Sequence, residues 1–110
     1  MVQISITRDE ETGRISGVII PENKTLEDYF ETEIQNDMAV IRHIRKKLPD
    51  AEEMDVDISG NAYCLTLGRD QFTIMPLFDK TAAPVSGPMG EFLYLLDQWY
   101  AFLLSNAGDY

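Results

Sequence analysis

The chain has 110 residues, of which 19 are Asp or Glu and 9 are Lys or Arg, so its formal net charge is −10. This charge repels nucleic-acid phosphates and anionic lipids, which argues against nucleic acid or a membrane as the partner and favours a basic protein. The length predicts one domain over residues 1–110, and an apolar fraction of 45% is typical of a folded chain. The acidity also aids solubility, so both interpretations stay open.

The first half of the chain predicts a hairpin and one long helix. Val2, Ile4 and Ile6 alternate with polar residues, and a second strand is expected over residues 14–20 after a polar turn at 9–13. Thr25 is the expected N-cap of the helix, and Pro49 is expected to end it. An apolar stripe with helical spacing lies between them: Leu26, Phe30, Ile34, Met38, Ile41, Ile44 and Leu48.

The second half predicts three more strands and a closing helix. The strands are expected at residues 54–58, 63–67 and 71–75, with short turns that favour antiparallel pairing. Residues 79–90 contain several Gly and Pro positions and are expected to form a loop. A helix from Met89 to Ser105 has a wide apolar face, which predicts deep burial or a homodimer formed through this helix.

These elements follow the order ββαβββα. They predict an α+β fold with an antiparallel five-stranded sheet and two helices on one face. The expected core contains Ile34, Ile41, Leu65, Leu67, Ile74, Leu96 and Trp99.

Few residues offer recognisable chemistry. His43 is the only histidine, and neither it nor Cys64 has the neighbours of a catalytic nucleophile or base. Asp55 and Asp57 match the opening of a calcium-binding loop, but Thr66 occupies the twelfth position, where a Glu is needed. We therefore expect no catalytic residue, no metal site and no cofactor. A small enzyme built on a carboxylate pair is the least favoured alternative.

The location of the protein is also predicted from composition. The beginning of the chain lacks the basic residues and long apolar run of a signal peptide, and no segment is long and apolar enough to span a bilayer. One cysteine cannot form a disulfide within the chain. We therefore expect a soluble cytoplasmic protein.

Acidic side chains gather in two segments. The first acidic segment comprises Glu27, Asp28, Glu31, Glu33 and Asp37. The second acidic segment comprises Asp50, Glu52, Glu53, Asp55 and Asp57. Carboxylates at this density can occupy the place of phosphates on a basic surface and speed association. We expect the second acidic segment to bind the partner, and a merely hydrated surface is the alternative.

Two stretches resemble a known family. Residues 60–67, with the sequence GNAYCLTL, are followed by a short turn and another strand, and resemble the central hairpin of some small bacterial immunity proteins. Residues 91–103, with the sequence EFLYLLDQWYAFL, resemble their closing helix. These immunity proteins accompany contact-dependent growth-inhibition toxins. The same arrangement also resembles the uncharacterised YacL-like proteins of bacteria.

The resemblance implies a non-enzymatic protein that neutralises a cognate toxin. Such toxins are commonly nucleases with basic surfaces, so an acidic inhibitor would block the active or substrate-binding surface. The alternative is a small adaptor or regulatory domain that binds another cytoplasmic protein and self-associates through the last helix.

Overall fold

The computed structural model describes residues 2–79 and 81–107, which form an α+β fold. The strands are β1 (Gln3–Arg8), β2 (Ile15–Ile20), β3 (Val56–Ser59), β4 (Tyr63–Leu67), β5 (Gln71–Pro76) and β6 (Val85–Pro88). The helices are α1 (Lys24–Tyr29), the π-helix η1 (Phe30–Ile34), α2 (Met38–Ala51) and α3 (Met89–Ala107).

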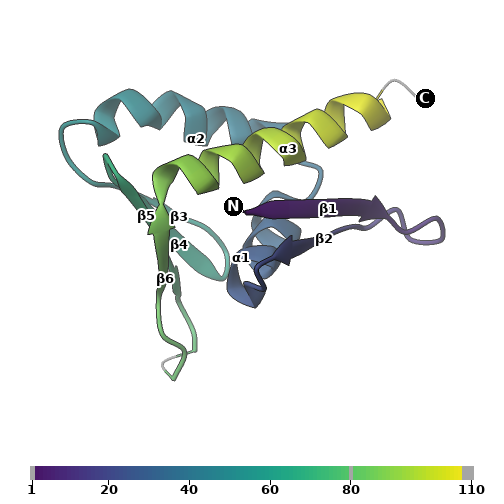
Figure 1. Cartoon of the computed structure of the whole chain (residues 1–110), viewed down its shortest axis with the longest axis horizontal. Coiled ribbons are helices and arrows are strands. Elements are labelled where there is room, and N and C mark those ends of the chain that lie inside the picture. Colours follow the sequence, from purple (N-terminus) through teal and green to yellow (C-terminus); the bar gives the residue numbers. More distant parts are fainter. Residues whose placement is uncertain (1, 80, 108–110) are drawn as a thin grey trace.

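The strands form two sheets, so the prediction of a single five-stranded sheet is wrong. β1 pairs with β2 in a two-stranded antiparallel sheet, and β3, β4, β5 and β6 form a second antiparallel sheet in that order. The predicted hairpin and the three predicted central strands are confirmed. The N-terminal hairpin lies apart because its buried face packs under α3 and beside α1, not along an edge of the larger sheet (Figure 1).

The sixth strand, β6, lies where a loop was expected at residues 79–90. β6 is an edge strand, and Pro88 is its last residue, a position at which the missing N–H of proline is tolerated. A Cβ on Gly87 would lie 3.0 Å from Cε1 of Phe72, so the glycine leaves room for the buried aromatic ring on β5. Pairing with β5 therefore outweighs the low strand propensity of these residues.

The prediction of one helix from Thr25 to Pro49 is wrong at both ends and in the middle. Asn23, not Thr25, caps α1, because its side chain accepts a hydrogen bond from the N–H of Leu26 at 3.1 Å. α2 continues past Pro49 to Ala51. The chain between these ends forms three separate segments, α1, η1 and α2.

The helical run breaks at Gln35, whose φ is 47°. Its side-chain Oε1 accepts a hydrogen bond from the N–H of Ile15 at 2.6 Å, and its Nε2 donates to the carbonyls of Ile15 and Glu31. Its own carbonyl accepts a hydrogen bond from Nε1 of Trp99 at 2.7 Å. These bonds to β2, η1 and α3 hold a backbone conformation that is rare outside glycine. Asp37 then caps α2 by accepting from the N–H of Ala39.

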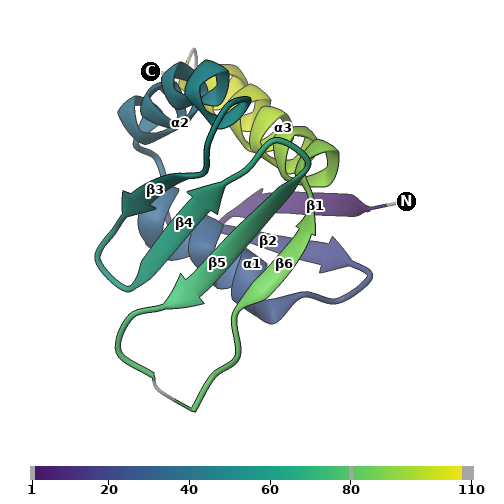
Figure 2. The same ribbon diagram turned by 90° about the vertical axis from the view of Figure 1, so that its left-hand side faces the viewer.

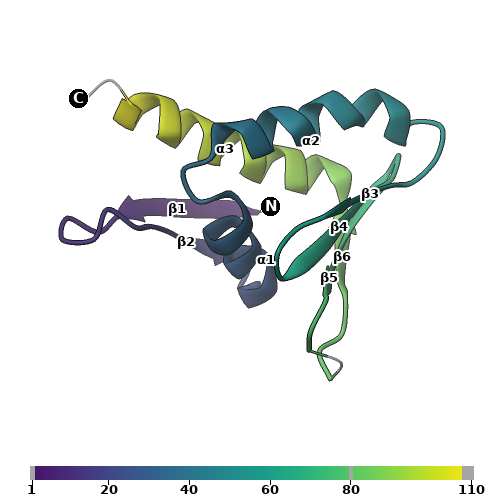
Figure 3. The same cartoon turned by 180° about the vertical axis from the view of Figure 1, so that it is seen from behind.

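The helices cover one face of the four-stranded sheet. α2 and α3 run side by side, and the sheet stands at one end of them (Figures 1 and 3). Figure 2 looks onto the sheet and shows α1 and the N-terminal hairpin behind it, with α2 and α3 across its upper end. The described residues therefore leave the near face of the sheet uncovered.

The core lies where the inner faces of both sheets meet the helices. Trp99 has no exposed surface and stacks on Phe30 with the ring centroids 5.4 Å apart. A Cβ on Gly17 would lie 3.2 Å from Cζ3 of Trp99, so this glycine lets β2 approach the ring. All the predicted core residues are buried: Ile34, Ile41, Leu65, Leu67, Ile74, Leu96 and Trp99.

Candidate functional site

The first acidic segment is used largely inside the fold. Glu27 is only 6% exposed, and its Oε2 accepts a hydrogen bond from the N–H of Ile19 at 2.7 Å. Nζ of Lys24 lies 3.6 Å from the other oxygen. This carboxylate therefore satisfies a backbone donor of β2 that would otherwise be buried without a partner.

Glu33 ties η1 to the turn between β3 and β4. Its two carboxylate oxygens accept hydrogen bonds from the N–H groups of Asn61 at 2.9 Å and Ala62 at 2.8 Å. A Cβ on Gly60 would lie 1.7 Å from Oε2 of Glu33. Because glycine has no side chain at position 60, the carboxylate of Glu33 can lie against this turn.

Asp28 and Asp37 also serve the fold. Asp37 caps α2, and the carboxylate of Asp28 accepts a hydrogen bond from the hydroxyl of Tyr63 on β4. Burial, followed by this hydrogen bond, raises the pKa of Tyr63 to about 12. Tyr63 therefore stays a hydrogen-bond donor throughout the neutral range.

The second acidic segment has a different environment. It runs from the last turn of α2 through a loop onto β3, and all its acidic residues are exposed: Asp50, Glu52, Glu53, Asp55 and Asp57. Among residues 2–79 and 81–107, no basic side chain forms an ion pair with any of them. Only the carboxylate of Asp57 accepts a hydrogen bond within this part of the chain, from Oγ1 of Thr66 at 2.7 Å. The structure thus leaves these charges available.

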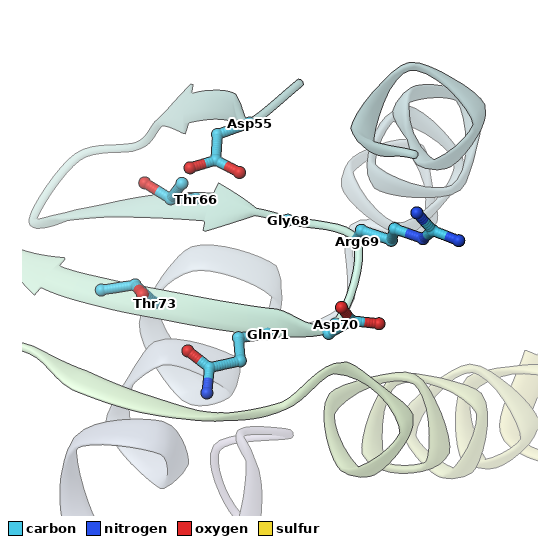
Figure 4. A pocket seen from close by; sticks show the side chains of 7 residues that line it. All are labelled: Asp55, Thr66, Gly68, Arg69, Asp70, Gln71 and Thr73. Atoms are coloured by element: carbon cyan, nitrogen blue, oxygen red, sulfur yellow. The ribbon is translucent and has the colours of Figure 1, made fainter. Parts of the chain in front are cut away.

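A shallow polar hollow of about 460 Å³ adjoins the second acidic segment (Figure 4). It is lined by Asp55, Thr66, Gly68, Arg69, Asp70, Gln71 and Thr73. In Figure 4 the guanidinium of Arg69 points away from the carboxylate of Asp55. These polar groups therefore do not converge as a nucleophile, a base and an orienting group would.

The uncovered sheet face beside this hollow is polar in the middle and apolar at one end. Thr66, Thr73 and Ser86 follow one another across β4, β5 and β6, and the hydroxyls of Thr73 and Ser86 lie 2.9 Å apart. Exposed apolar side chains follow at the end of β5, where Met75 is 49% and Phe78 82% exposed. The face thus offers hydroxyl groups and apolar anchors next to an acidic edge.

The predicted strand at residues 54–58 accounts for the calcium-loop pattern. Asp57 lies within β3, where the side chains of Val56 and Ile58 turn inward and that of Asp57 turns outward. Within the described part of the chain, no three or more His, Cys, Asp or Glu side chains are grouped so that they could hold a metal ion.

A second groove, of about 500 Å³, lies between the helices and the end of β3. Glu33, Asp37 and His43 line it from one side, and Ser59 and Asn61 line it from the other. Tyr29 also lines it. Sequence reasoning missed this groove because its walls come from residues 29–43 and 58–61, and no local motif links them.

Comparison of the chain with protein-family models, curated proteins and solved structures finds no match. The resemblance to immunity proteins therefore stays a prediction. Within the described residues, no helix combines the length and the hydrophobicity needed to cross a membrane.

Proposed function

We propose that this protein is a non-enzymatic binding protein that docks a basic partner on the second acidic segment and the adjoining uncovered sheet face. One observation supports this most directly. The carboxylates of this segment are exposed and form no ion pair within the described part of the chain, whereas the carboxylates of Glu27, Asp28, Glu33 and Asp37 are engaged in the fold. Unpaired surface charges of one sign attract a partner of the opposite sign and orient its approach.

Apolar side chains near these charges supply the short-range contacts. Met54, within the second acidic segment, is 71% exposed. Met75 lies near the far end of β5, and Phe78 follows two residues after that strand ends. Exposed methionine and aromatic side chains are frequent anchors in protein interfaces. A partner that spans the sheet face would contact both the acidic edge and the apolar end.

The proposed partner is a toxin domain, and we propose that this toxin is a nuclease. A nuclease surface is basic because it binds phosphates, and the carboxylates of the second acidic segment would occupy that surface and exclude the nucleic acid. The resemblance of residues 60–67 and 91–103 to immunity proteins supports this choice. The proposed encounter is cytoplasmic, because cellular nucleic acids are found there.

The alternative is an adaptor that self-associates through α3. Its support is limited to Tyr94 and Leu104, which are 43% and 51% exposed on that helix. Most of the wide apolar face of α3 is buried within the chain, including Phe92 and Leu96. Sedimentation analysis of wild type and the Leu104→Glu variant distinguishes the alternatives, since the adaptor requires a dimer that this charge disrupts.

The proposed function is tested with the product of the neighbouring upstream gene, which the proposal requires to contain the toxin domain. Purified protein should block the activity of that domain, and a variant with Glu52→Gln, Glu53→Gln, Asp55→Asn and Asp57→Asn should require a higher concentration to do so. No inhibition and no complex with that domain would reject the immunity function.

A further inference from the structure

A tyrosine hydroxyl that forms no hydrogen bond within the described part of the chain opens onto the groove between η1, α2 and the end of β3. Tyr29 is 3% exposed, and its ring packs edge-on against Phe30 and Tyr63. Within the described part of the chain, no group forms a hydrogen bond with its hydroxyl. The rest of this side chain is enclosed, but the hydroxyl oxygen itself reaches the surface of the groove. Tyr29 lines the groove, so a ligand in the groove can supply that partner.

The other polar groups of the groove are mostly hydrogen-bond acceptors. Glu33 faces it, and the hydrogen bonds from Asn61 and Ala62 occupy only part of the acceptor capacity of its carboxylate. Asp37 also lines the groove, and its Oδ1 is engaged by the N–H of Ala39, which leaves Oδ2 for a ligand. A site with two carboxylates and a hydroxyl is suited to a cation with several N–H donors.

We propose that this groove binds the guanidinium group of an arginine side chain from the partner protein. A guanidinium has five N–H donors in one plane, is weakly hydrated and stacks on aromatic rings. In the groove it would donate to the carboxylates of Glu33 and Asp37 and to the hydroxyl oxygen of Tyr29. A lysine ammonium is more strongly hydrated and cannot form a planar, forked set of hydrogen bonds, so arginine suits this partly buried site better.

The groove is continuous with the surface proposed for the partner. β3 begins next to Asp55 in the second acidic segment and ends at Ser59, which lines the groove. A strand of this length spans about 13 Å, so one basic surface can reach both places. This inference rests on the proposed function, because the arginine is taken to belong to the same partner.

The first experiment uses a small probe and needs no partner. The ¹⁵N-labelled whole chain is titrated with N-acetyl-arginine methylamide and, in parallel, with the citrulline analogue, which has a similar shape and no charge. The arginine probe should shift the amide signals of Asn61 and Ala62 with a dissociation constant on the order of millimolar. The citrulline probe should bind at least about fivefold more weakly.

Two conservative variants test the assigned contacts. Tyr29→Phe removes only the unused hydroxyl, and Asp37→Asn keeps a good helix cap while it removes the charge. Each should weaken binding of the arginine probe about three- to tenfold. Tyr94→Phe is the matched control, because Tyr94 lies exposed on α3 and does not line the groove, and it should bind the probe as wild type does. Equal binding of the citrulline probe, unshifted Asn61 and Ala62 signals, or wild-type binding by Tyr29→Phe would overturn the proposal.

The source of the guanidinium is tested with the toxin domain. Tyr29→Phe should speed dissociation of the complex about fivefold. Unchanged dissociation together with retained probe binding would assign the groove to a free guanidinium compound and overturn the choice of a partner arginine. Probe binding without any toxin complex would reject the proposed function and leave the groove as a guanidinium site. If the arginine probe does not bind while toxin binding still depends on the second acidic segment, the guanidinium site in the groove is rejected and the proposed function stands.

Discussion

The first and second acidic segments are alike in composition and different in use. Each contributes five carboxylates within about eleven residues or fewer, and each lies in or beside a helix. In the first segment, Glu27 and Glu33 accept hydrogen bonds from backbone N–H groups of β2 and of the β3–β4 turn. In the second segment, the carboxylates are exposed, and only that of Asp57 accepts a hydrogen bond within the described part of the chain.

This contrast shows that the net charge of a protein does not measure the charge available to a partner. A carboxylate that satisfies a backbone donor is held in place and partly neutralised by that donor. An exposed carboxylate without a partner projects its field into solvent. Removing the carboxylate of Glu27 or Glu33 should therefore lower stability, and neutralising the second segment should alter binding.

The largest expected effect comes from Glu27. Glu27→Ala leaves the N–H of Ile19 without its acceptor in a buried place and should lower the free energy of unfolding by about 2–3 kcal/mol. Glu22→Ala is the control, because Glu22 is exposed and should change stability by less than about 0.5 kcal/mol. Urea unfolding measures both. A loss below about 0.5 kcal/mol for Glu27→Ala would show that this carboxylate is not needed by the fold.

Glu33 and Gly60 should act as one unit. Glu33→Ala removes two hydrogen bonds, and Gly60→Ala displaces the same carboxylate, so each should destabilise by about 2 kcal/mol. The double variant should be less destabilised than the sum, with a coupling of about 1–2 kcal/mol. Gly90→Ala is the control, since a Cβ at position 90 on α3 meets nothing within 4 Å and should be neutral or stabilising. Additive losses at Glu33 and Gly60 would contradict the assigned contact.

The raised pKa of Tyr63 predicts that the folded chain loses stability at alkaline pH. An unfolded tyrosine ionises near pH 10, whereas burial and Asp28 raise the pKa of Tyr63 to about 12 in the folded chain. Between these pH values the unfolded state releases a proton that the folded state keeps. The stabilisation of the folded state by the Tyr63 hydroxyl is therefore complete below pH 10 and is lost as the pH rises to about 12. Tyr63→Phe should flatten the decline of stability over this window. Unfolding curves measured from pH 9 upward check this, and an unchanged decline would exclude Tyr63 as its source.

The smallest effect on stability is expected for the second acidic segment. Replacing Glu52 and Glu53 with Gln, and Asp55 and Asp57 with Asn, should change the free energy of unfolding by no more than about 0.5 kcal/mol, because these side chains are exposed. Asn at position 57 keeps an oxygen acceptor for Thr66. A loss above about 1 kcal/mol in chemical unfolding would mean that this segment also serves the fold.

Much of the fold follows from local patterns. The alternation of apolar residues is sufficient to predict β1, β3 and β4, and turn residues next to apolar runs predict β2 and β5. The helical spacing around Trp99 is sufficient to predict α3 and its buried face. The break at Gln35 is not predictable in this way, because the apolar stripe continues through it. The bonds that hold it come from Ile15 and Trp99, which are distant in sequence. β6 was missed because its pairing with β5 outweighs its Gly and Pro content.

The candidate site was predictable only in part. Exposure of Asp55 and Asp57 follows from their alternation with Met54, Val56 and Ile58. Glu27 and Glu33 accept hydrogen bonds from the N–H groups of Ile19 and Asn61. These donors come close only in the folded chain, and no local sequence pattern predicts the pairs. The groove at Tyr29 likewise exists only once η1 meets the β3–β4 turn.

We propose that the position of its carboxylates, and not the net charge of the whole protein, makes the second acidic segment a binding surface. Two variants with the same change in net charge test it: Glu52→Gln with Glu53→Gln, and Glu10→Gln with Glu11→Gln. Both pairs are exposed, and the loop after α2 and the turn between β1 and β2 lie at opposite ends of the molecule (Figure 1).

The measurement is the association rate with the toxin domain as a function of ionic strength. The variant at residues 52 and 53 should associate about three- to tenfold more slowly at low salt and depend less on salt, while the variant at residues 10 and 11 should stay close to wild type. Equal effects of the two variants would show that only net charge matters. No effect of either variant would remove the second acidic segment from the interface.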